Sequence, residues 1–361
     1  MAQWPRPQNV EAYVRHSKIR TIHFGIGAIG SEVVRLAARR PDIEIVGAID
    51  SNPGKAGKDL GEVAGLGRSL GIEISYNPES ILRDFYADVV VHTTGSSLTV
   101  VYPELAQILD AERSIVSSCE ELSYPWSRRA DLAQTLDQKA REKGVRILGT
   151  GVNPGFVMDM LPLFLATTCQ EVKSIHVRRV VDIAARRVQL QRKLGIGLSV
   201  AGFKQAAADE AVGHVGLRES ASLIAETIGW RLDALTETVE PVQARGKLKT
   251  EYFTLEKGAV AGVKQVAVGS AAGQEVLRLE LEMSLGAENP HDYIRIEGTP
   301  PLEVRIAGGV QGDQATAAII VNCLPAIAFS GAQVGLLTMR DMPAVPFWRP
   351  RPSPSERIAG L

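Results

Sequence analysis

Residues 19–50 read IRTIHFGIGAIGSEVVRLAARRPDIEIVGAID, and this stretch decides the fold. It holds an apolar run suited to a strand, a glycine-rich turn at residues 25–30, and then apolar residues at helical spacing. A second apolar run follows and ends at Asp50. This order of strand, GxGxxG turn, helix and carboxylate-terminated strand predicts a Rossmann-type dinucleotide-binding unit.

The glycine-rich turn suits a bound dinucleotide. Gly25 allows a tight turn, Gly27 lets the backbone approach a pyrophosphate, and Gly30 lets the helix pack closely on the strand. The amide groups that open the helix, at Ala28 and Ile29, then face the phosphates. We predict NAD(H) or NADP(H) as the cofactor; the alternative is a glycine-rich turn of structural use only.

The end of the second strand bears on which cofactor is used. Asp50 is placed to hydrogen-bond the adenosine ribose, which favours NAD(H) because a carboxylate repels a 2′-phosphate. Ser51, Asn52 and Lys55 follow closely, and they would hold that phosphate if the loop shifted. Use of both cofactors therefore stays open, and the alternative for Lys55 is an ordinary solvated lysine.

The rest of the chain predicts two kinds of sheet. Residues 1–150 are expected to form the Rossmann domain, because short apolar runs alternate with amphipathic segments through residues 19–150. This pattern indicates a parallel sheet covered by helices on both faces. Residues 151–312 begin with helices and continue with strand patterns, so we expect an α+β substrate and dimerisation domain with a mainly antiparallel sheet. Residues 313–345 are expected to be C-terminal helices that return to the Rossmann domain. The fold class is thus α/β, with a surface extension at residues 1–18 and an irregular proline-rich tail at 343–354.

Composition excludes several classes of function. The chain has 361 residues and a net charge of −1, so no overall field attracts nucleic acid or anionic lipid. No apolar stretch of about 18 residues predicts a membrane span. Three cysteines without CxxC pairing and six histidines without HxxxH spacing predict no disulfide framework and no metal site. We therefore expect a cytoplasmic protein that acts on a small molecule.

Polar residues follow two further strands of the parallel sheet. Thr93, Thr94 and Gly95 follow one buried strand and are expected to line the ribose nearest the nicotinamide, unless they form a simple loop. Glu120 and Glu121 follow the next strand. Because consecutive strand residues point in opposite directions, at most one should face the substrate, where burial would raise its pKa. The alternative is that both begin a surface helix.

The segment that joins the first domain to the second, and the strand that follows it, supply further candidate site residues. Asn153, in the sequence VNPGF at 152–156, can present its amide to a ligand carbonyl or to the nicotinamide carboxamide, and Phe156 is either a pocket wall or core. His176 and Arg178 lie two residues apart on one strand face and are predicted to contact substrate. Asn322, in the C-terminal helix, is predicted to contact the cofactor.

Charged residues cluster between positions 178 and 187. They are Arg178, Arg179, Asp182, Arg186 and Arg187. Such a cluster either binds a substrate carboxylate or the cofactor phosphates, or forms an ion-pair network at a domain or dimer interface.

Several motifs together resemble a known family. The N-terminal half resembles the dihydrodipicolinate reductase N-terminal domain, and residues 19–343 resemble 2,4-diaminopentanoate dehydrogenases and the native amine dehydrogenases. The motifs are GIGAIG, AIDSNPGKAGKDLGE, SSCEELSYPW, GTGVNPGFVMD, VRRVVDIAARRVQLQRKLGIGLSVAGF, ATAAIIVNCLPA and GLLTMRDMP. The chain lacks the DAPSGTA-like run of dihydrodipicolinate reductases, which argues against a lysine-pathway role.

The resemblance implies an activity. It implies reversible reductive amination of a ketone or aldehyde with ammonia and a reduced nicotinamide cofactor, in a homodimer. It also implies a conserved glutamate near the reacting carbon, which falls on the Glu120–Glu121 pair. Glu120 is favoured, because homoserine-type dehydrogenases resemble this arrangement with a catalytic lysine at a similar strand end, while Glu121 stays open. The competing interpretations are a carbonyl or imine reductase that does not use ammonia, and a non-catalytic NAD(P) sensor.

Overall fold

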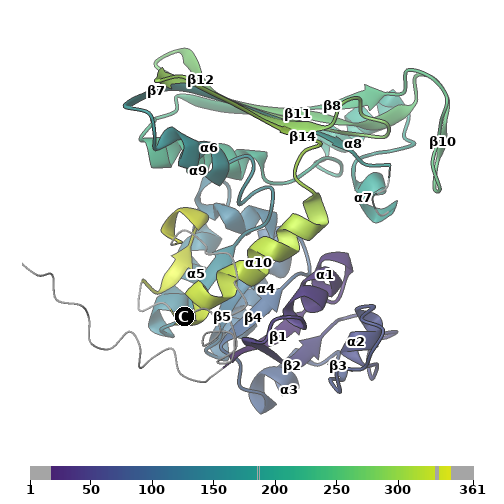
Figure 1. Ribbon diagram of the computed structural model, residues 1–361, viewed down its shortest axis with the longest axis vertical. Coiled ribbons are helices and arrows are strands. Elements are labelled where there is room, and N and C mark those ends of the chain that lie inside the picture. The colour runs from purple at the N-terminus through teal and green to yellow at the C-terminus, as the bar shows by residue number, and fades with distance from the viewer. Residues whose placement is uncertain (1–17, 185, 187, 330–332, 343–361) are drawn as a thin grey trace, which may run out of the picture.

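The protein consists of two sheets joined through a layer of helices and loops. The computed structural model describes residues 18–184, 186, 188–329 and 333–342. Figure 1 shows one sheet with its helices in the lower part of the view and a second, broad sheet across the top. Residues 1–17 of the expected extension, Arg187 and the proline-rich tail lie outside the described residues.

The first sheet has seven strands, all parallel, in the order β15-β6-β5-β4-β1-β2-β3. This confirms the Rossmann-type parallel sheet. Short, fully buried runs such as the VVVH of β4 form its centre, as expected when both faces are covered. The strands are β1 (Ile19–Phe24), β2 (Ile43–Ile49), β3 (Ile74–Ser75), β4 (Val89–His92), β5 (Ser114–Ser117), β6 (Arg146–Gly149) and β15 (Gly335–Leu337).

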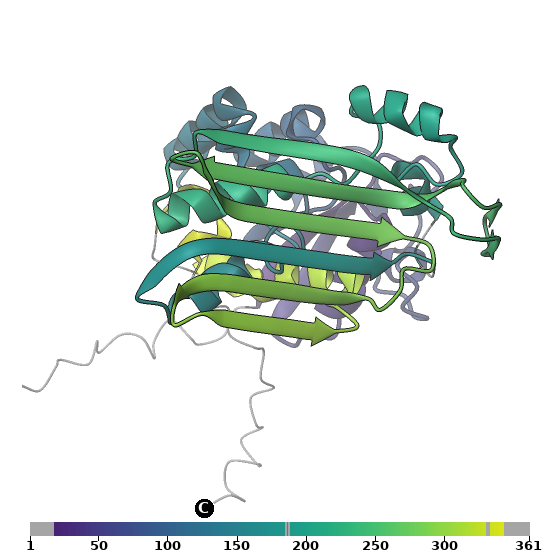
Figure 2. The same ribbon diagram turned by 90° about the horizontal axis from the view of Figure 1, so that it is seen from above.

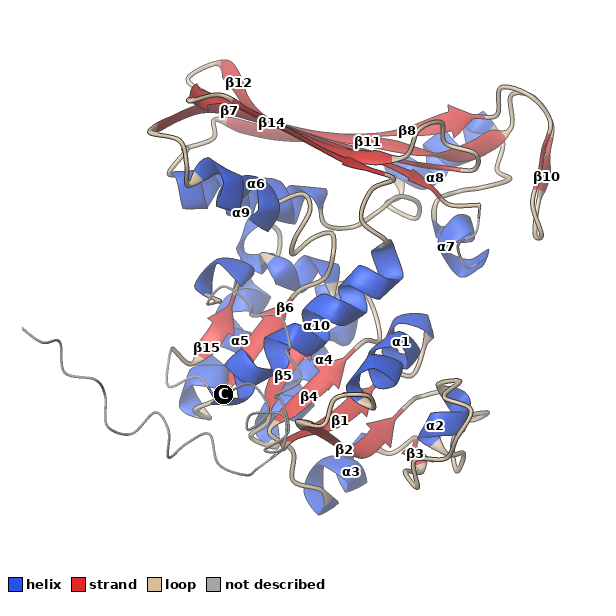
Figure 3. Ribbon diagram, viewed as in Figure 1, coloured by secondary structure: helices blue, strands red, loops and turns tan. Residues whose placement is uncertain are grey.

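Helices cover both faces of this sheet (Figure 3). Apolar side chains of α1 (Ala28–Ala37) and α10 (Gly312–Phe329) pack on one face. Those of α3 (Pro78–Asp84), α4 (Leu98–Asp110) and α5 (Ala130–Glu142) pack on the other, and α2 (Leu60–Val63) lies at the edge. By length and composition α10 is apolar enough to cross a membrane, and here its buried residues from Ala317 to Ile327 belong to the core beside β4 and β5.

The second sheet has six strands in the order β14-β13-β7-β12-β11-β8. Only the β7–β12 pair is parallel, so the expected mainly antiparallel sheet is confirmed. Figure 2 shows this sheet from its uncovered side. The strands are β7 (Glu171–Asp182), β8 (Ala234–Gln243), β11 (Val260–Ala271), β12 (Gln274–Ser284), β13 (His291–Thr299) and β14 (Leu302–Ala307), with a small hairpin of β9 (Leu248–Lys249) and β10 (Thr254–Leu255).

The inner face of the second sheet carries helices and a large apolar core. Phe203 and Ile224, for example, are fully buried there against strand residues. The helices are α6 (Met160–Ala166), α7 (Val188–Lys193), α8 (Val200–Ala208) and α9 (Leu217–Ile228), and three short 3-10 turns complete the elements, η1 (Glu120–Ser123), η2 (Pro125–Ser127) and η3 (Met339–Asp341).

The structure corrects the expected C-terminal helices. Helix α10 ends at Phe329, and residues 335–337 form β15, which pairs with β6 at the edge of the first sheet. A three-residue strand gives too short an apolar pattern to separate it from a preceding helix. After the second sheet the chain runs back along the first sheet as helix α10, strand β15 and the 3-10 turn η3.

Candidate active site

A cavity of about 530 Å³ lies between the two sheets, beyond the carboxyl ends of β1, β4, β5 and β6. This is the place where open parallel sheets bind ligands. Its wall on the first sheet comes from residues 27–29, 93–96, 118, 120 and 150–154. Its other wall comes from β7, α7, the loop before α9, β12 and the start of α10, through Arg179, Val181, Arg186, Gln189, Leu190, Lys193, Leu194, Gly213, His214, Leu281, Met283, Gly312, Asp313 and Thr316.

The glycine-rich turn has the geometry that a diphosphate requires. Gly25 has φ +94°, and a Cβ there would lie 2.7 Å from the Thr93 carbonyl oxygen. A Cβ at Gly30 would collide with the Gly25 carbonyl, so this glycine is needed for close packing. Gly27 differs, since a Cβ there would meet nothing within 4 Å. Gly27 is the N-cap residue of α1 and lines the cavity. The space beside it is therefore open to a ligand at the start of the helix.

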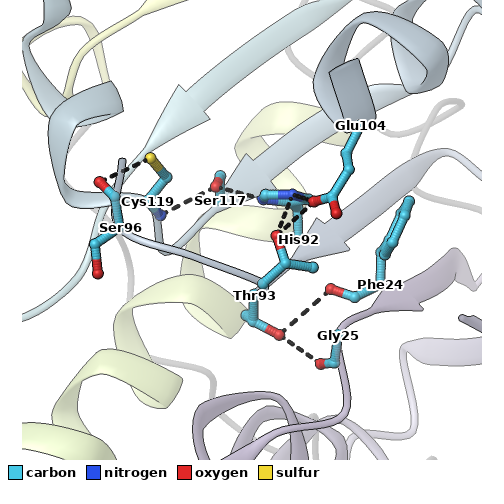
Figure 4. Close-up of polar contacts among 9 residues, drawn as sticks. Phe24, Gly25, His92, Thr93, Ser96, Glu104, Ser117 and Cys119 are labelled. Atoms are coloured by element: carbon cyan, nitrogen blue, oxygen red, sulfur yellow. Dashed lines mark hydrogen bonds and ion pairs between the residues drawn. The ribbon is translucent and has the colours of Figure 1, made fainter. Parts of the chain in front are cut away.

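The strand ends beside this turn are held together by side-chain hydrogen bonds (Figure 4). Thr93 Oγ1 donates to the Gly25 carbonyl at 2.7 Å, which ties the predicted ribose-binding segment to the glycine turn. Cys119 Sγ donates to the Ser96 carbonyl at 3.2 Å. The loops that follow β4 and β5 are therefore fixed to each other and to the turn.

The buried side chain of His92 links the ends of β4 and β5 through hydrogen bonds. His92 Nδ1 lies 2.8 Å from Ser117 Oγ, and His92 Nε2 lies 2.8 Å from Glu104 Oε2 (Figure 4). Thr94 Oγ1 donates to the same Glu104 oxygen, and Ser117 Oγ accepts from the Cys119 amide. Burial acts to raise the pKa of Glu104, but the hydrogen bonds from His92 and Thr94 bring it below its ordinary value. His92 is thus a fully buried histidine whose two ring nitrogens both have hydrogen-bond partners.

The two adjacent glutamates have separate surroundings. Glu120 is half-buried and lines the cavity. Glu121 is buried, and its Oε2 accepts hydrogen bonds from the amide of Leu98 at 2.6 Å and the hydroxyl of Ser97, at the start of α4. Its other oxygen lies 3.7 Å from Arg129 Nη2. Glu121 therefore caps a helix, and of the two glutamates only Glu120 lines the cavity.

The segment after β6 offers acceptors without partners. The Asn153–Pro154 peptide bond is cis, and Asn153 is 8% exposed. Among the described residues, neither Asn153 Oδ1 nor Thr150 Oγ1 has a hydrogen-bond partner, although both residues line the cavity. Buried polar atoms are rarely left unpaired, so these atoms fit the carboxamide or ribose of a nicotinamide cofactor. With the open space at Gly27, they show that the residues present suit NAD(H) or NADP(H).

The wall on the second sheet is rich in cations. Arg179 is buried and pairs with Asp292 at 2.7 Å, while Arg186 pairs with Asp313 at 2.6 Å. These pairs are the ion-pair network that was one interpretation of the charged cluster. Lys193 Nζ donates to Ser96 Oγ at 2.9 Å, and within the described ranges it has no carboxylate at ion-pair distance.

His214 is a cavity residue that the sequence argument did not select. Its backbone is clamped by Gln265, whose side chain accepts from the His214 amide and donates to its carbonyl. Burial first, and then the nearby Lys193 and Arg179, lower the pKa of His214 to about 3, so the imidazole is neutral. The available signal was the pair of glycines in GHVG at 213–216, both with positive φ, which fix a sharp bend around the histidine.

The structure corrects the predicted substrate contacts. His176 and Arg178 do share a strand face, but it is the outer face of the second sheet, where they lie near Glu280 and Glu282. Their neighbour Arg179 points inward to the cavity. Alternation predicts two faces but not which one is covered.

Two other predicted contacts also lie away from the cavity. Phe156 is 37% exposed and does not line it. Asn322 is on α10, where its Oδ1 is 3.5 Å from Arg40 Nη1. Ser51 and Asn52 are exposed beside Asp50 at the end of β2, toward the place expected for the adenosine.

In the described part of the chain, no group of three or more His, Cys, Asp or Glu side chains is arranged to hold a metal ion.

Comparison with known proteins agrees with this architecture. Residues 19–117 match the dihydrodipicolinate reductase N-terminus, and residues 156–349 match the 2,4-diaminopentanoate dehydrogenase C-terminal domain. A 2,4-diaminopentanoate dehydrogenase from Acetoanaerobium sticklandii is 31% identical over 333 residues, which cover 90% of this chain and 94% of that protein. An amine dehydrogenase from Streptomyces virginiae is 24% identical over 83% of this chain and 88% of its own length.

A solved structure gives the same result. The amine dehydrogenase from Mycobacterium smegmatis superposes with a TM-score of 0.83 and 25% identity, covering 92% of this chain and 98% of that one. The two family models together cover residues 19–117 and 156–349, which include the glycine turn and the strands of the second sheet. The chain therefore belongs to the 2,4-diaminopentanoate dehydrogenase family, whose members bind NAD or NADP on a dihydrodipicolinate reductase-like domain.

Proposed function

We propose that the protein catalyses the reversible reductive amination of a ketone or aldehyde with ammonia, using NAD(H) or NADP(H). Membership of the family makes it an oxidoreductase that acts on CH–NH2 groups. The observation that carries the proposal is the separation of the two glutamates. Glu121 caps helix α4, whereas Glu120 places its carboxylate in the lining of a cavity that suits a nicotinamide.

The proposed role of Glu120 is to move protons and to stabilise a cation. The bound nicotinamide supplies or accepts the hydride. Glu120 accepts a proton from ammonium, so that neutral ammonia attacks the carbonyl carbon, and returns a proton to the hydroxyl that leaves the carbinolamine as water. The iminium that results is positively charged, and the nearby carboxylate stabilises it before hydride arrives.

The opposite wall supports a substrate with both apolar and anionic parts. Val181, Leu281 and Met283 offer apolar surface. Lys193 offers an ammonium whose charge no described carboxylate neutralises, so it suits a substrate carboxylate. The neutral His214 adds a hydrogen-bonding group that does not repel an iminium.

The organisation proposed for the chain follows the same division. We propose a cofactor domain at 1–150, a substrate and dimerisation domain at 151–312, and a C-terminal return at 313–345. The uncovered face of the second sheet, which Figure 2 shows, would form the homodimer interface. The free cysteines Cys119, Cys169 and Cys323 fit a reducing cytoplasm. Sedimentation analysis tests the dimer, and a monomer at micromolar concentration would contradict it.

Ammonium dependence and one variant test the function together. NADH or NADPH oxidation with a panel of small ketones, aldehydes and keto acids should require ammonium. We expect Glu120→Gln to lower kcat by about 10²- to 10⁴-fold, with the dissociation constant for NADH unchanged within about twofold. Glu112→Gln is the matched control. Glu112 is an exposed carboxylate that pairs with Lys143 near the amino ends of β5 and β6, away from the cavity at their carboxyl ends.

Other outcomes would replace the proposal. Carbonyl-dependent oxidation without ammonium would identify a carbonyl or imine reductase. Binding of the cofactor without any turnover, in either direction and with amines as well, would favour a sensor. Full activity of Glu120→Gln in the ammonium-dependent reaction would reject Glu120 as the proton carrier.

A further inference from the structure

Asp50 is not available to a ribose in the way its position in the sequence suggests. It is only 6% exposed, and its oxygens are already used within the protein. Oδ2 accepts from the Ile26 amide at 2.7 Å and from Lys55 Nζ at 2.8 Å, and Oδ1 accepts from the Asn52 amide at 2.9 Å. Burial acts to raise the pKa of Asp50, but these three hydrogen bonds bring it below its ordinary value. Asp50 is therefore a charged, internally bonded carboxylate.

Lys55 bridges Asp50 and the glycine turn. Its Nζ donates to Asp50 Oδ2 and, at 2.9 Å, to the Ile26 carbonyl. A lysine ammonium has three N–H groups, so one is left for solvent or for a ligand. The Lys55 side chain is 24% exposed, so it is partly open to solvent.

The neighbouring loop presents further donors to the same place. Asn52 Oδ1 accepts from the Gly54 amide, which leaves the Asn52 side-chain NH2 group free to donate. Ser51 and Asn52 are both exposed. Lys55 thus neutralises the carboxylate that would repel a phosphate, and the exposed Ser51 hydroxyl and Asn52 NH2 group add neutral hydrogen-bond donors beside it.

We propose that Lys55 is a specificity-determining residue that lets this enzyme accept NADP(H) as well as NAD(H). Lys55 neutralises Asp50 and places its remaining N–H, beside Ser51 and Asn52, where the 2′-phosphate of the adenosine ribose would lie. The carboxylate that normally selects NAD(H) then serves to hold the lysine and the glycine turn in register.

Equilibrium binding tests this without any catalytic readout. The dissociation constants for NADPH and NADH are measured by titrating the reduced-nicotinamide fluorescence with the full-length protein. For Lys55→Met we expect the ratio of the NADPH constant to the NADH constant to rise at least about tenfold, and Lys55→Arg should restore it to within about threefold. Lys143→Met is the control, since this lysine makes an ion pair with Glu112 near the amino ends of β5 and β6.

If Lys55→Met changes both constants by the same factor, or neither, Lys55 has only a structural role and the proposal fails. If that variant does not fold, the wild-type protein still decides the question. Raising the salt concentration should weaken NADPH binding more than NADH binding, because the 2′-phosphate contact is a contact between charges. A ratio that does not change with salt overturns the proposal.

Discussion

Replacing Glu219 by glutamine should stabilise the protein at alkaline pH and leave it nearly unchanged at acid pH. Glu219 lies in the first turn of α9 and is 1% exposed. Neither of its carboxyl oxygens has a hydrogen-bond partner among the described residues. Burial, reinforced by Glu121 and Glu237 and opposed by its own backbone amide and Arg128, raises the pKa of Glu219 to about 7.

The expected magnitude follows from that pKa. In the unfolded chain the group titrates near its ordinary value of 4.5, and in the folded protein near 7. Folding therefore takes up a proton between these values, so the free energy of unfolding falls as pH rises from 4.5 to 7. At about 1.4 kcal/mol per pH unit, the loss amounts to roughly 3 kcal/mol. Glutamine cannot ionise, so the variant escapes this loss.

Denaturation at two pH values measures the effect. Unfolding by urea is compared at about pH 5 and about pH 8.5 for the wild-type protein, Glu219→Gln and Glu226→Gln. Glu226 is the control because it is on the same helix but exposed, where it pairs with Arg340. We expect Glu219→Gln to gain about 2–3 kcal/mol over the wild type between the two pH values, and the control to gain little. Equal pH dependence in all three proteins would refute the reasoning.

Two further predictions concern the turn and the bend that flank the cavity. Gly27→Ala should leave the thermal midpoint nearly unchanged but weaken NADH binding about tenfold or more, whereas Gly30→Ala should lower the midpoint by several degrees, because its Cβ collides with the Gly25 carbonyl. Equal loss of binding and stability in both variants would contradict this. Asp159→Ala should cost about 3 kcal/mol, since this fully buried carboxylate accepts from two amides and a serine hydroxyl that would lose their partner. Urea unfolding of Asp159→Ala and Asp159→Asn checks it, and an alanine variant as stable as wild type would show that water replaces those bonds.

The parts of the site that the sequence predicted are those fixed by local geometry. A strand, a GxGxxG turn and a helix can be arranged in few ways, so the positions of Gly25, Gly27 and Gly30 follow directly. The carboxyl ends of parallel strands meet at one edge, which brings the segments at 93–96 and 118–120 to the cavity. Glu120 and Glu121 lie in a 3-10 turn and not on a strand, and of the two only Glu120 lines the cavity.

The parts that could not be predicted depend on long-range packing. Whether Arg178 or Arg179 faces the cavity depends on which side of the second sheet receives the helices, and no local pattern encodes that side. His214 reaches the cavity through a clamp by Gln265, which is 51 positions away in sequence. Lys55 donates a hydrogen bond to Asp50 from the loop that follows β2. The course of that loop depends on Asp59, because its carboxylate accepts hydrogen bonds from several amides of residues 61–72.

The chain crosses between the two sheets only twice within the described residues, and both crossings border the cavity. The first runs from β6 through residues 150–154, and the second runs from β14 into α10 through Gly308, Gly309 and Gly312. Any pivoting of the upper sheet over the lower one would bend the backbone at these two places. Such a movement of one sheet relative to the other would also change the width of the cavity through which substrate enters. Asn153 and Asp313 would lie beside the two places where the backbone bends.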